Sequence, residues 1–170
     1  MRHSQLSFIN KVPDQAVQFQ SQWKLYIDGA ARNNPGPAGA GIYLCKDSSV
    51  IASHGFFLGS KTNNQAEYLA LLLGIFYFRR HVSSGDRIHI ISDSKLLVNQ
   101  MMGNYRVKND VLLRMQHIAF ALLKDHVYFF SHVMRELNKH ADKLANLGID
   151  RQLYPPTQFI QLLQEHGITF

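Results

Sequence analysis

Four carboxylates in short, distinctive contexts could do chemistry on this chain: Asp28, Glu67, Asp93 and Asp142. Asp28 opens a stretch rich in Gly and Pro, and Glu67 closes the stretch Thr-Asn-Asn-Gln-Ala-Glu. Asp93 lies in Ile-Ile-Ser-Asp-Ser, and Asp142 in His-Ala-Asp-Lys. Each alone is an ordinary cap or turn residue, but the ordered set indicates a site. Dozens of residues separate each from the next, so only a fold could bring them together.

Carboxylates held together repel one another, because two unit charges 4 Å apart cost about 4 kcal/mol at an effective dielectric near 20. Burial and like charges raise their pKa values unless cations neutralise the cluster. All-oxygen ligand sets select hard cations, Mg²⁺ first with Mn²⁺ as a substitute. Two such ions can drive the hydrolysis of a phosphodiester. The four carboxylates therefore predict a site for two divalent ions.

Hydrophobic periodicity predicts the elements that must position these residues. Strands are expected at about 23–28, 41–45, 50–58, 87–92 and 127–133. Helices are expected at about 65–81, 94–102, 110–124, 139–148 and 157–167. Thr62 to Asn64, Ser94, Asn109 or Asp110, Asn138 and Thr157 are the expected N-caps. Three strands joined by short turns form an antiparallel meander, and a helical crossover makes the fourth strand parallel to the first.

This order of elements gives the carboxylates a meeting place. Asp28 and Asp93 follow strands predicted to be parallel, and ligands gather at the carboxyl ends of such strands. Glu67 is expected in the first turn of the first helix, on the stripe that faces the sheet. Asp142 is expected in the first turn of the helix after Asn138, where the helix dipole favours negative charge. Gly74, costly inside a helix, is expected to let that helix approach the sheet.

Composition narrows the class of protein. A length of 170 residues favours one domain, and a net charge of +6 with a pI near 9.6 favours a polyanionic partner. The longest apolar run, 68–78, is too short for a membrane span. The single cysteine, Cys45, and the absence of a signal-peptide pattern at Met1 predict a reducing, cytoplasmic compartment. We expect an N-terminal extension at 1–22, a catalytic domain at 23–150 and a C-terminal tail with a short helix at 151–170.

The four contexts resemble, in order and in kind, the acidic positions of the ribonuclease H type 1 family. The resemblance covers about residues 23–150 and is most specific at 28–39 and 62–67. It implies an α/β, ribonuclease H-like fold, with a five-stranded mixed sheet (three strands antiparallel, two parallel) and helices on both faces. It also implies that the four carboxylates are catalytic metal ligands. The implied activity is cleavage of the RNA strand of RNA–DNA hybrids, which leaves 5′-phosphate and 3′-hydroxyl ends.

The resemblance also implies where the substrate lies. Asn34 and Gly36, in the Asn-Pro-Gly turn, would follow the substrate backbone. Asn64 and Gln65 would lie at the minor groove, where 2′-hydroxyls distinguish RNA from DNA. Plain N-capping is the other interpretation of these two residues, and the two roles can coexist. Lys95 is a further expected substrate contact.

The loop before the last acidic residue departs from the best-known members of the family. Those members carry a Gly-His loop whose histidine assists proton transfer or product release. Here 133–138 is shorter and resembles the short-loop branch, which has Arg-Glu-x-Asn. His140 and His132 are possible proton-transfer aids, although His132 is also expected to end the fifth strand. Arg135 could contact substrate or a carboxylate, or form a surface ion pair with Glu136.

A second departure lies between the second and third helices. Some members carry an extra basic helix there that grips the hybrid, whereas 103–108 leaves room for only a short turn. Binding would then depend on a small basic set: Arg32, Lys95, Arg106 and Lys108. No protein partner is implied, and a monomer is expected.

Two alternatives remain at this stage. One is a DNA-cutting nuclease on the same fold, which the Asn64-Gln65 and Asn34-Pro35-Gly36 contexts disfavour. The other is a non-catalytic module that binds hybrids. Intact carboxylates disfavour that module, because a pure binder of phosphates gains nothing from a negative cluster.

Overall fold

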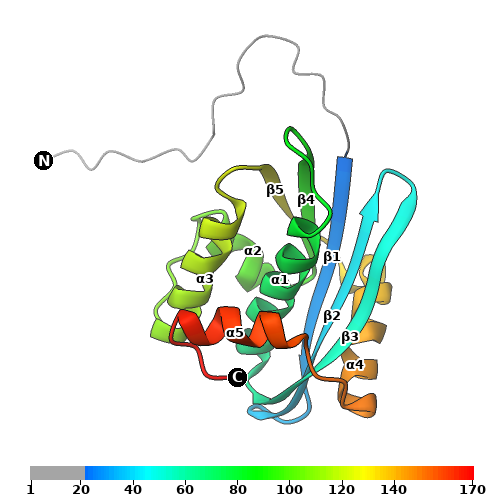
Figure 1. The fold of residues 1–170 in the computed structure, drawn as a ribbon. Coiled ribbons are helices and arrows are strands. Elements are labelled where there is room, and N and C mark those ends of the chain that lie inside the picture. The colour runs from blue at the N-terminus through cyan, green and yellow to red at the C-terminus, as the bar shows by residue number, and fades with distance from the viewer. Residues whose placement is uncertain (1–21) are drawn as a thin grey trace, which may run out of the picture.

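The computed structural model describes residues 22–170, which form one mixed sheet covered by helices on both faces (Figure 1). The strands lie in the order β3-β2-β1-β4-β5. Their bounds are β1 Gln22–Ala31, β2 Gly36–Lys46, β3 Ser49–Lys61, β4 Arg87–Ser92 and β5 Val127–His132. The β1, β2 and β3 strands pair antiparallel, whereas β4 pairs parallel with both β1 and β5. The predicted fold class is confirmed.

The helices divide unequally between the two faces of the sheet. Their bounds are α1 Asn63–Arg79, α2 Lys95–Met101, α3 Asp110–Leu123, α4 Lys139–Arg151 and α5 Thr157–Glu165, with a short 3-10 turn, η1, at Arg135–Leu137. The α1, α2, α3 and α5 helices lie on one side, and α4 lies on the other (Figure 1). Among the described residues, no helix is long and apolar enough to cross a membrane.

The α1 helix is the centre of the core. Ten of its seventeen residues are buried, because the sheet covers one side of the helix and α3 and α5 lie toward the other. A Cβ atom built on Gly74 would lie 2.6 Å from the Leu25 side chain on β1. Gly74 therefore permits close contact between helix and sheet, as the sequence predicted.

Glycines also let α4 approach the opposite face. Cβ atoms on Gly41 and Gly55 would lie 2.0 Å from the backbone oxygens of Ala141 and Leu144. These glycines on β2 and β3 leave room for the α4 backbone to lie directly on the sheet. This approach brings the first turn of α4, and Asp142 with it, toward the end of β1.

Several local expectations need correction. The α1 helix begins at Asn63, so Glu67 lies beyond its first turn and not within it. Asn138 precedes α4 but its side chain makes no capping hydrogen bond. Pro156, not Thr157, occupies the N-cap position of α5. Most strands are longer than predicted because the backbone ladder continues into turns that sequence patterns assign to loops.

The predicted N-terminal and C-terminal segments are described to different extents. The predicted N-terminal extension falls outside the described residues, except for Gln22, which begins β1. At the other end, Phe159, Leu163 and Ile168 belong to the main hydrophobic core. The segment after α4 therefore packs against the body of the protein.

Candidate active site

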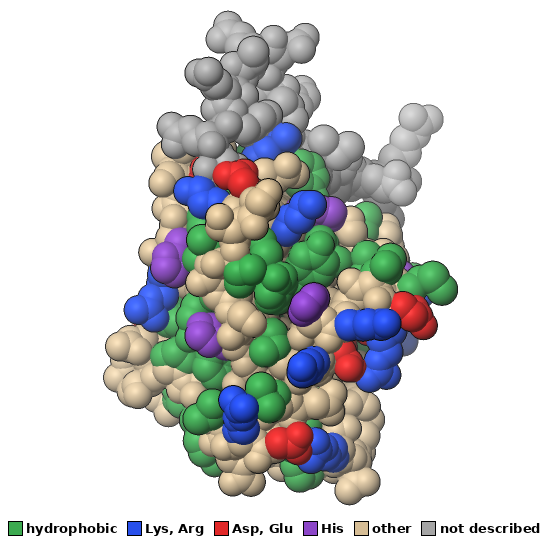
Figure 2. Space-filling view, turned by 90° about the vertical axis from the view of Figure 1, so that its right-hand side faces the viewer, with side chains coloured by type: hydrophobic (Ala, Val, Ile, Leu, Met, Phe, Trp, Pro, Cys, Tyr) green, Lys and Arg blue, Asp and Glu red, His purple; other side chains and the backbone are tan. Residues whose placement is uncertain are grey.

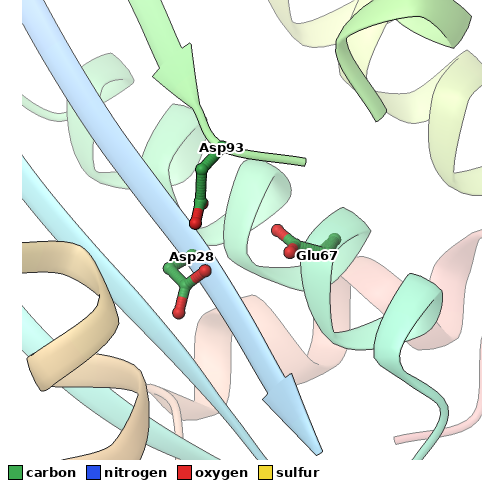
Figure 3. A group of neighbouring side chains, drawn as sticks. All are labelled: Asp28, Glu67 and Asp93. Atoms are coloured by element: carbon green, nitrogen blue, oxygen red, sulfur yellow. The ribbon is translucent and has the colours of Figure 1, made fainter. Parts of the chain in front are cut away.

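Three of the four predicted carboxylates meet at one end of the sheet (Figure 3). Oxygen atoms of Asp28, Glu67 and Asp93 all lie within 4.8 Å of one another. Asp28 comes from β1, Asp93 follows β4, and Glu67 projects from α1. The fold thus joins residues that are far apart in sequence.

The strand register and Gly29 bring the three carboxylates together. Ile27 of β1 pairs with Ser92 of β4. The residues that follow them, Asp28 and Asp93, therefore lie side by side at the same end of the sheet. Gly29 lies so close to α1 that a Cβ atom there would be 2.2 Å from the backbone nitrogen of Glu67. The backbone N–H of Gly29 also donates to Oε2 of Glu67 at 3.1 Å. The β1 strand therefore orients two of the three carboxylates.

The fourth predicted carboxylate, Asp142, lies at the rim. Its Oδ1 accepts a hydrogen bond from Nη2 of Arg135 at 2.5 Å, and it is outside the close group of three. Its negative charge still acts on Asp28, whose pKa it helps to raise. Arg135 therefore contacts a carboxylate, one of the contacts predicted for it, rather than forming an ion pair with Glu136.

Asn138 connects the site to α4. Its Nδ2 donates to the backbone oxygen of Ile27 and to Oδ1 of Asp93, both at 2.8 Å. The side chain is only 1% exposed. These bonds fix the Asp93 carboxylate and fasten the start of α4 to β1. Sequence reasoning assigned Asn138 only as a cap and missed this role, since residues 45 and 111 positions away supply its partners.

Burial and like charges act on the carboxylates of the cluster. Burial, then the charges of Asp93 and Asp142, raise the pKa of Asp28 from 3.8 to about 7. Burial and the charge of Asp28 raise the pKa of Glu67 well above its usual value, against the opposing hydrogen bond from Gly29. Hard divalent cations prefer such a set of carboxylate oxygens, so the residues present fit a divalent metal ion.

The residues predicted to contact substrate surround the start of α1. Asn34 accepts a hydrogen bond from the backbone N–H of Asn63 at 3.1 Å, which ties the Asn-Pro-Gly turn to the helix. Gln65 forms a capping box with Thr62. Asn64 is exposed beside them, whereas Gly36 is buried where a Cβ atom would lie 2.0 Å from the Arg32 oxygen. N-capping therefore accounts for the orientation of the Gln65 side chain, whereas the side chain of Asn64 is exposed to solvent.

The basic and histidine candidates lie further out. Lys95 is exposed at the first position of α2, and Arg106 and Lys108 are exposed in the loop before α3. Arg32 forms an exposed ion pair with Asp150 at 2.6 Å. His132 ends β5, as predicted.

His140 lies on the first turn of α4, also as predicted, and its ring stacks on that of Tyr43 with centroids 4.9 Å apart. His140 is therefore exposed to solvent while one face of its ring is covered by Tyr43.

A carboxylate cluster where the parallel pairing of β1 with β4 ends, on this sheet, matches a ribonuclease H-like fold. A family model described as reverse transcriptase-like matches residues 26–148. Ribonuclease HI of Halobacterium salinarum is 36% identical over 132 residues, which cover 74% of this chain and 63% of that protein. The chain belongs to the type 1 ribonuclease H family.

Solved structures agree with this assignment. The crystal structure of RNase H1 from Halobacterium salinarum matches with a TM-score of 0.72 and 35% identity, covering 76% of this chain and 98% of that one. The N-terminal RNase H domain of Rv2228c from Mycobacterium tuberculosis matches with a TM-score of 0.73 and 34% identity, covering 78% and 96%. LC11-RNase H1 in complex with RNA/DNA hybrid matches with a TM-score of 0.70 and 32% identity, covering 76% and 97%.

The full-length relatives are longer than the matched region. This chain spans 63% of the length of the halobacterial protein and 34% of the bifunctional protein Rv2228c. The similarity therefore concerns the ribonuclease H domain of each relative.

Proposed function

We propose that this chain is a metal-dependent endonuclease that hydrolyses the RNA strand of RNA–DNA hybrids. The observation that carries the proposal is the group of three carboxylates within 4.8 Å, in which burial and like charges raise the pKa values of Asp28 and Glu67. Membership of the type 1 ribonuclease H family supports the reaction, and the hybrid bound to LC11-RNase H1 supports the substrate.

Asp28, Glu67, Asp93 and Asp142 would hold two Mg²⁺ ions, with Mn²⁺ as a substitute. When bound, such ions would activate a water and stabilise the leaving oxygen of a phosphodiester. The products would carry 5′-phosphate and 3′-hydroxyl ends.

The chain's own residues prepare this chemistry. Asn138 fixes Asp93 through Oδ1, and the Gly29 N–H fixes Glu67 through Oε2, so neither carboxylate needs to reorganise. Asp142 would complete the metal site from the rim, where Arg135 donates to its Oδ1. Arg135, 73% exposed in its side chain, would also bind a phosphate of the substrate. His140 or His132 would assist proton transfer.

Discrimination of RNA from DNA would occur at the start of α1. Asn64 has an exposed amide that can both donate to and accept from a 2′-hydroxyl. Gln65 would contribute to the same groove alongside its capping bond with Thr62. Asn34 and Gly36 would follow the backbone, and Lys95 would bind phosphate.

Two further assignments belong to this proposal. The chain would act as a monomer, which size-exclusion chromatography with light scattering tests directly. It would act in the cytoplasm, and its single cysteine, Cys45, supports a reducing compartment. Fractionation of cells that express the chain at low level tests the compartment.

Cleavage assays in Mg²⁺ test the function. The substrates are an end-labelled RNA–DNA hybrid, duplex DNA and duplex RNA of one sequence, and Asp93→Asn is the inactive control. Internal cuts in the RNA of the hybrid alone support the proposal. Cuts in duplex DNA would favour the DNA-cutting alternative, and binding of hybrid without cuts would favour the non-catalytic module.

A further inference from the structure

A slot of about 250 Å³ lies beside the carboxylates, on the face of the sheet that carries α4. It is bounded by β1, β2, the turn between β2 and β3, and the start of α4. Its lining includes Lys24, Tyr26, Tyr43, Val50, Asn138 and His140. Figure 2 shows the β3 and α4 side of the molecule, where hydrophobic, basic and histidine side chains lie close together and acidic ones are sparse.

Three aromatic rings form one wall of this slot. Tyr43 and His140 are stacked with an interplanar angle of 12° and centroids 4.9 Å apart, and Tyr26 lies 6.2 Å from Tyr43 at 58°. None of the three belongs to the main hydrophobic core of the described residues. The core therefore does not account for these rings, and their position at an open slot suits a planar ligand.

The slot shares a wall with the carboxylate cluster. Asn138 lines the slot and also donates to Asp93. Tyr26 precedes Asp28 by two residues on the same face of β1, a separation of about 6.8 Å along a strand. The slot thus lies close to the group that would be cut.

We propose that this slot binds one unpaired nucleotide of the RNA strand next to the scissile phosphate, an inference that rests on the proposed function. The base stacks on an outer face of the Tyr43–His140 pair, and Lys24 binds a neighbouring phosphate. Stacking on aromatic side chains is how proteins hold single-stranded nucleic acid without a sequence requirement. Bases inside a duplex are covered on both faces by their neighbours. The ligand is therefore RNA that leaves the hybrid at an end or a junction.

Binding measurements in the Asp93→Asn background, in Mg²⁺, test the proposal. One hybrid has flush ends, a second carries a short unpaired extension of the RNA strand, and a third carries the same extension on the DNA strand. The first unpaired base is 2-aminopurine, whose fluorescence falls on stacking. The RNA extension should raise the affinity at least about fivefold, since stacking contributes about 1–3 kcal/mol per base. Fluorescence should fall on that hybrid.

Variants then assign the gain to the slot. Tyr43→Leu should bring the ratio of extended to flush affinity to about one, whereas Tyr43→Trp should keep it. Tyr154→Leu, at an exposed tyrosine near the far end of α4, is the matched control and should keep the ratio. If Tyr43→Leu does not fold, Lys24→Gln at an exposed position should lower the ratio instead.

The results separate this inference from the proposed function. Equal affinity for flush and RNA-extended hybrids, an equal gain from the DNA extension, or an unchanged ratio in Tyr43→Leu would overturn the slot. If the parent still cuts flush hybrid in those cases, the proposed function stands. Failure of the parent to cut any hybrid overturns the proposed function, and the affinity ratio still decides whether the slot binds RNA.

Discussion

Replacing Asp28 with Asn should stabilise the metal-free protein while abolishing its activity. Asp28 is 6% exposed, and its pKa is raised from 3.8 to about 7. Each unit of raised pKa corresponds to about 1.36 kcal/mol, so ionising this group in the folded state costs up to about 4 kcal/mol. Asp28 shares a side-chain hydrogen bond with Asp93. Part of the cost therefore remains with Asp93 in the variant, and we expect a net gain of about 2 kcal/mol.

The gain in stability of Asp28→Asn should increase with pH. A carboxyl group whose pKa is higher in the folded state than in the unfolded state stabilises the fold fully only below the unfolded value. For Asp28 this contribution decreases from about pH 4 upward and is lost as the pH passes 7. Asp28→Asn should therefore resemble the parent in stability near pH 4 and exceed it most at pH 8. About 2 kcal/mol corresponds to a rise of roughly 4–8 °C in melting temperature for a chain of this size.

Thermal melts in chelator at pH 4, 6 and 8 measure this effect. Asp125→Asn, an exposed aspartate between α3 and β5, removes the same charge elsewhere and should show no pH-dependent gain. Mg²⁺ should raise the melting temperature of the parent more than that of Asp28→Asn, because ligand binding to the folded state stabilises it. A lower melting temperature for Asp28→Asn at pH 8, or an equal response to Mg²⁺, would refute a crowded carboxylate site.

Three further predictions follow from the same structure. Asp93→Asn should abolish cleavage in Mg²⁺ but keep most of the hybrid affinity, and normal turnover would remove Asp93 from the site. Hybrid affinity should fall steeply with salt, by about −0.9 in the log–log slope for each phosphate neutralised on B-form DNA, and a slope near zero would show that the exposed basic residues lie away from substrate. Gly74→Ala should destabilise the protein by about 1–3 kcal/mol through contact with Leu25, despite better helix propensity, in urea unfolding; an increase in stability would contradict that packing.

The architecture was predictable because its causes are local. Alternating apolar residues define each strand, and Thr62, Ser94 and Asn109 begin their helices with side-chain capping bonds. The meander and the helical crossover then fix which strands are antiparallel and which parallel. The capping box at Thr62 moved the start of α1 two residues earlier than periodicity indicated. Glu67 consequently lies outside the first turn, and its orientation comes from Gly29 rather than from the helix dipole.

The meeting of Asp28 and Asp93 was predictable for a similar reason, since parallel neighbours place their carboxyl ends at one edge. The contacts around them were not, because they depend on residues distant in sequence. Gly41 and Gly55 set how closely α4 approaches the sheet. No sequence periodicity marks these glycines, because each is required only by the α4 backbone that packs over it in the folded protein.

The position of Asp142 shows how these distant contacts matter for the chemistry. In the absence of metal, two opposite tendencies act on this carboxylate: repulsion from Asp28 and attraction to Arg135. The pair with Arg135 is exposed on the arginine side, where ion pairs contribute only about 0–1 kcal/mol. A divalent charge beside Asp28 would change the repulsion into attraction and outweigh such a pair. Asp28, Glu67 and Asp93 are thus placed by β1, α1 and β4, whereas the position of Asp142 depends on the turn that carries Arg135 and on the packing of α4 against the sheet.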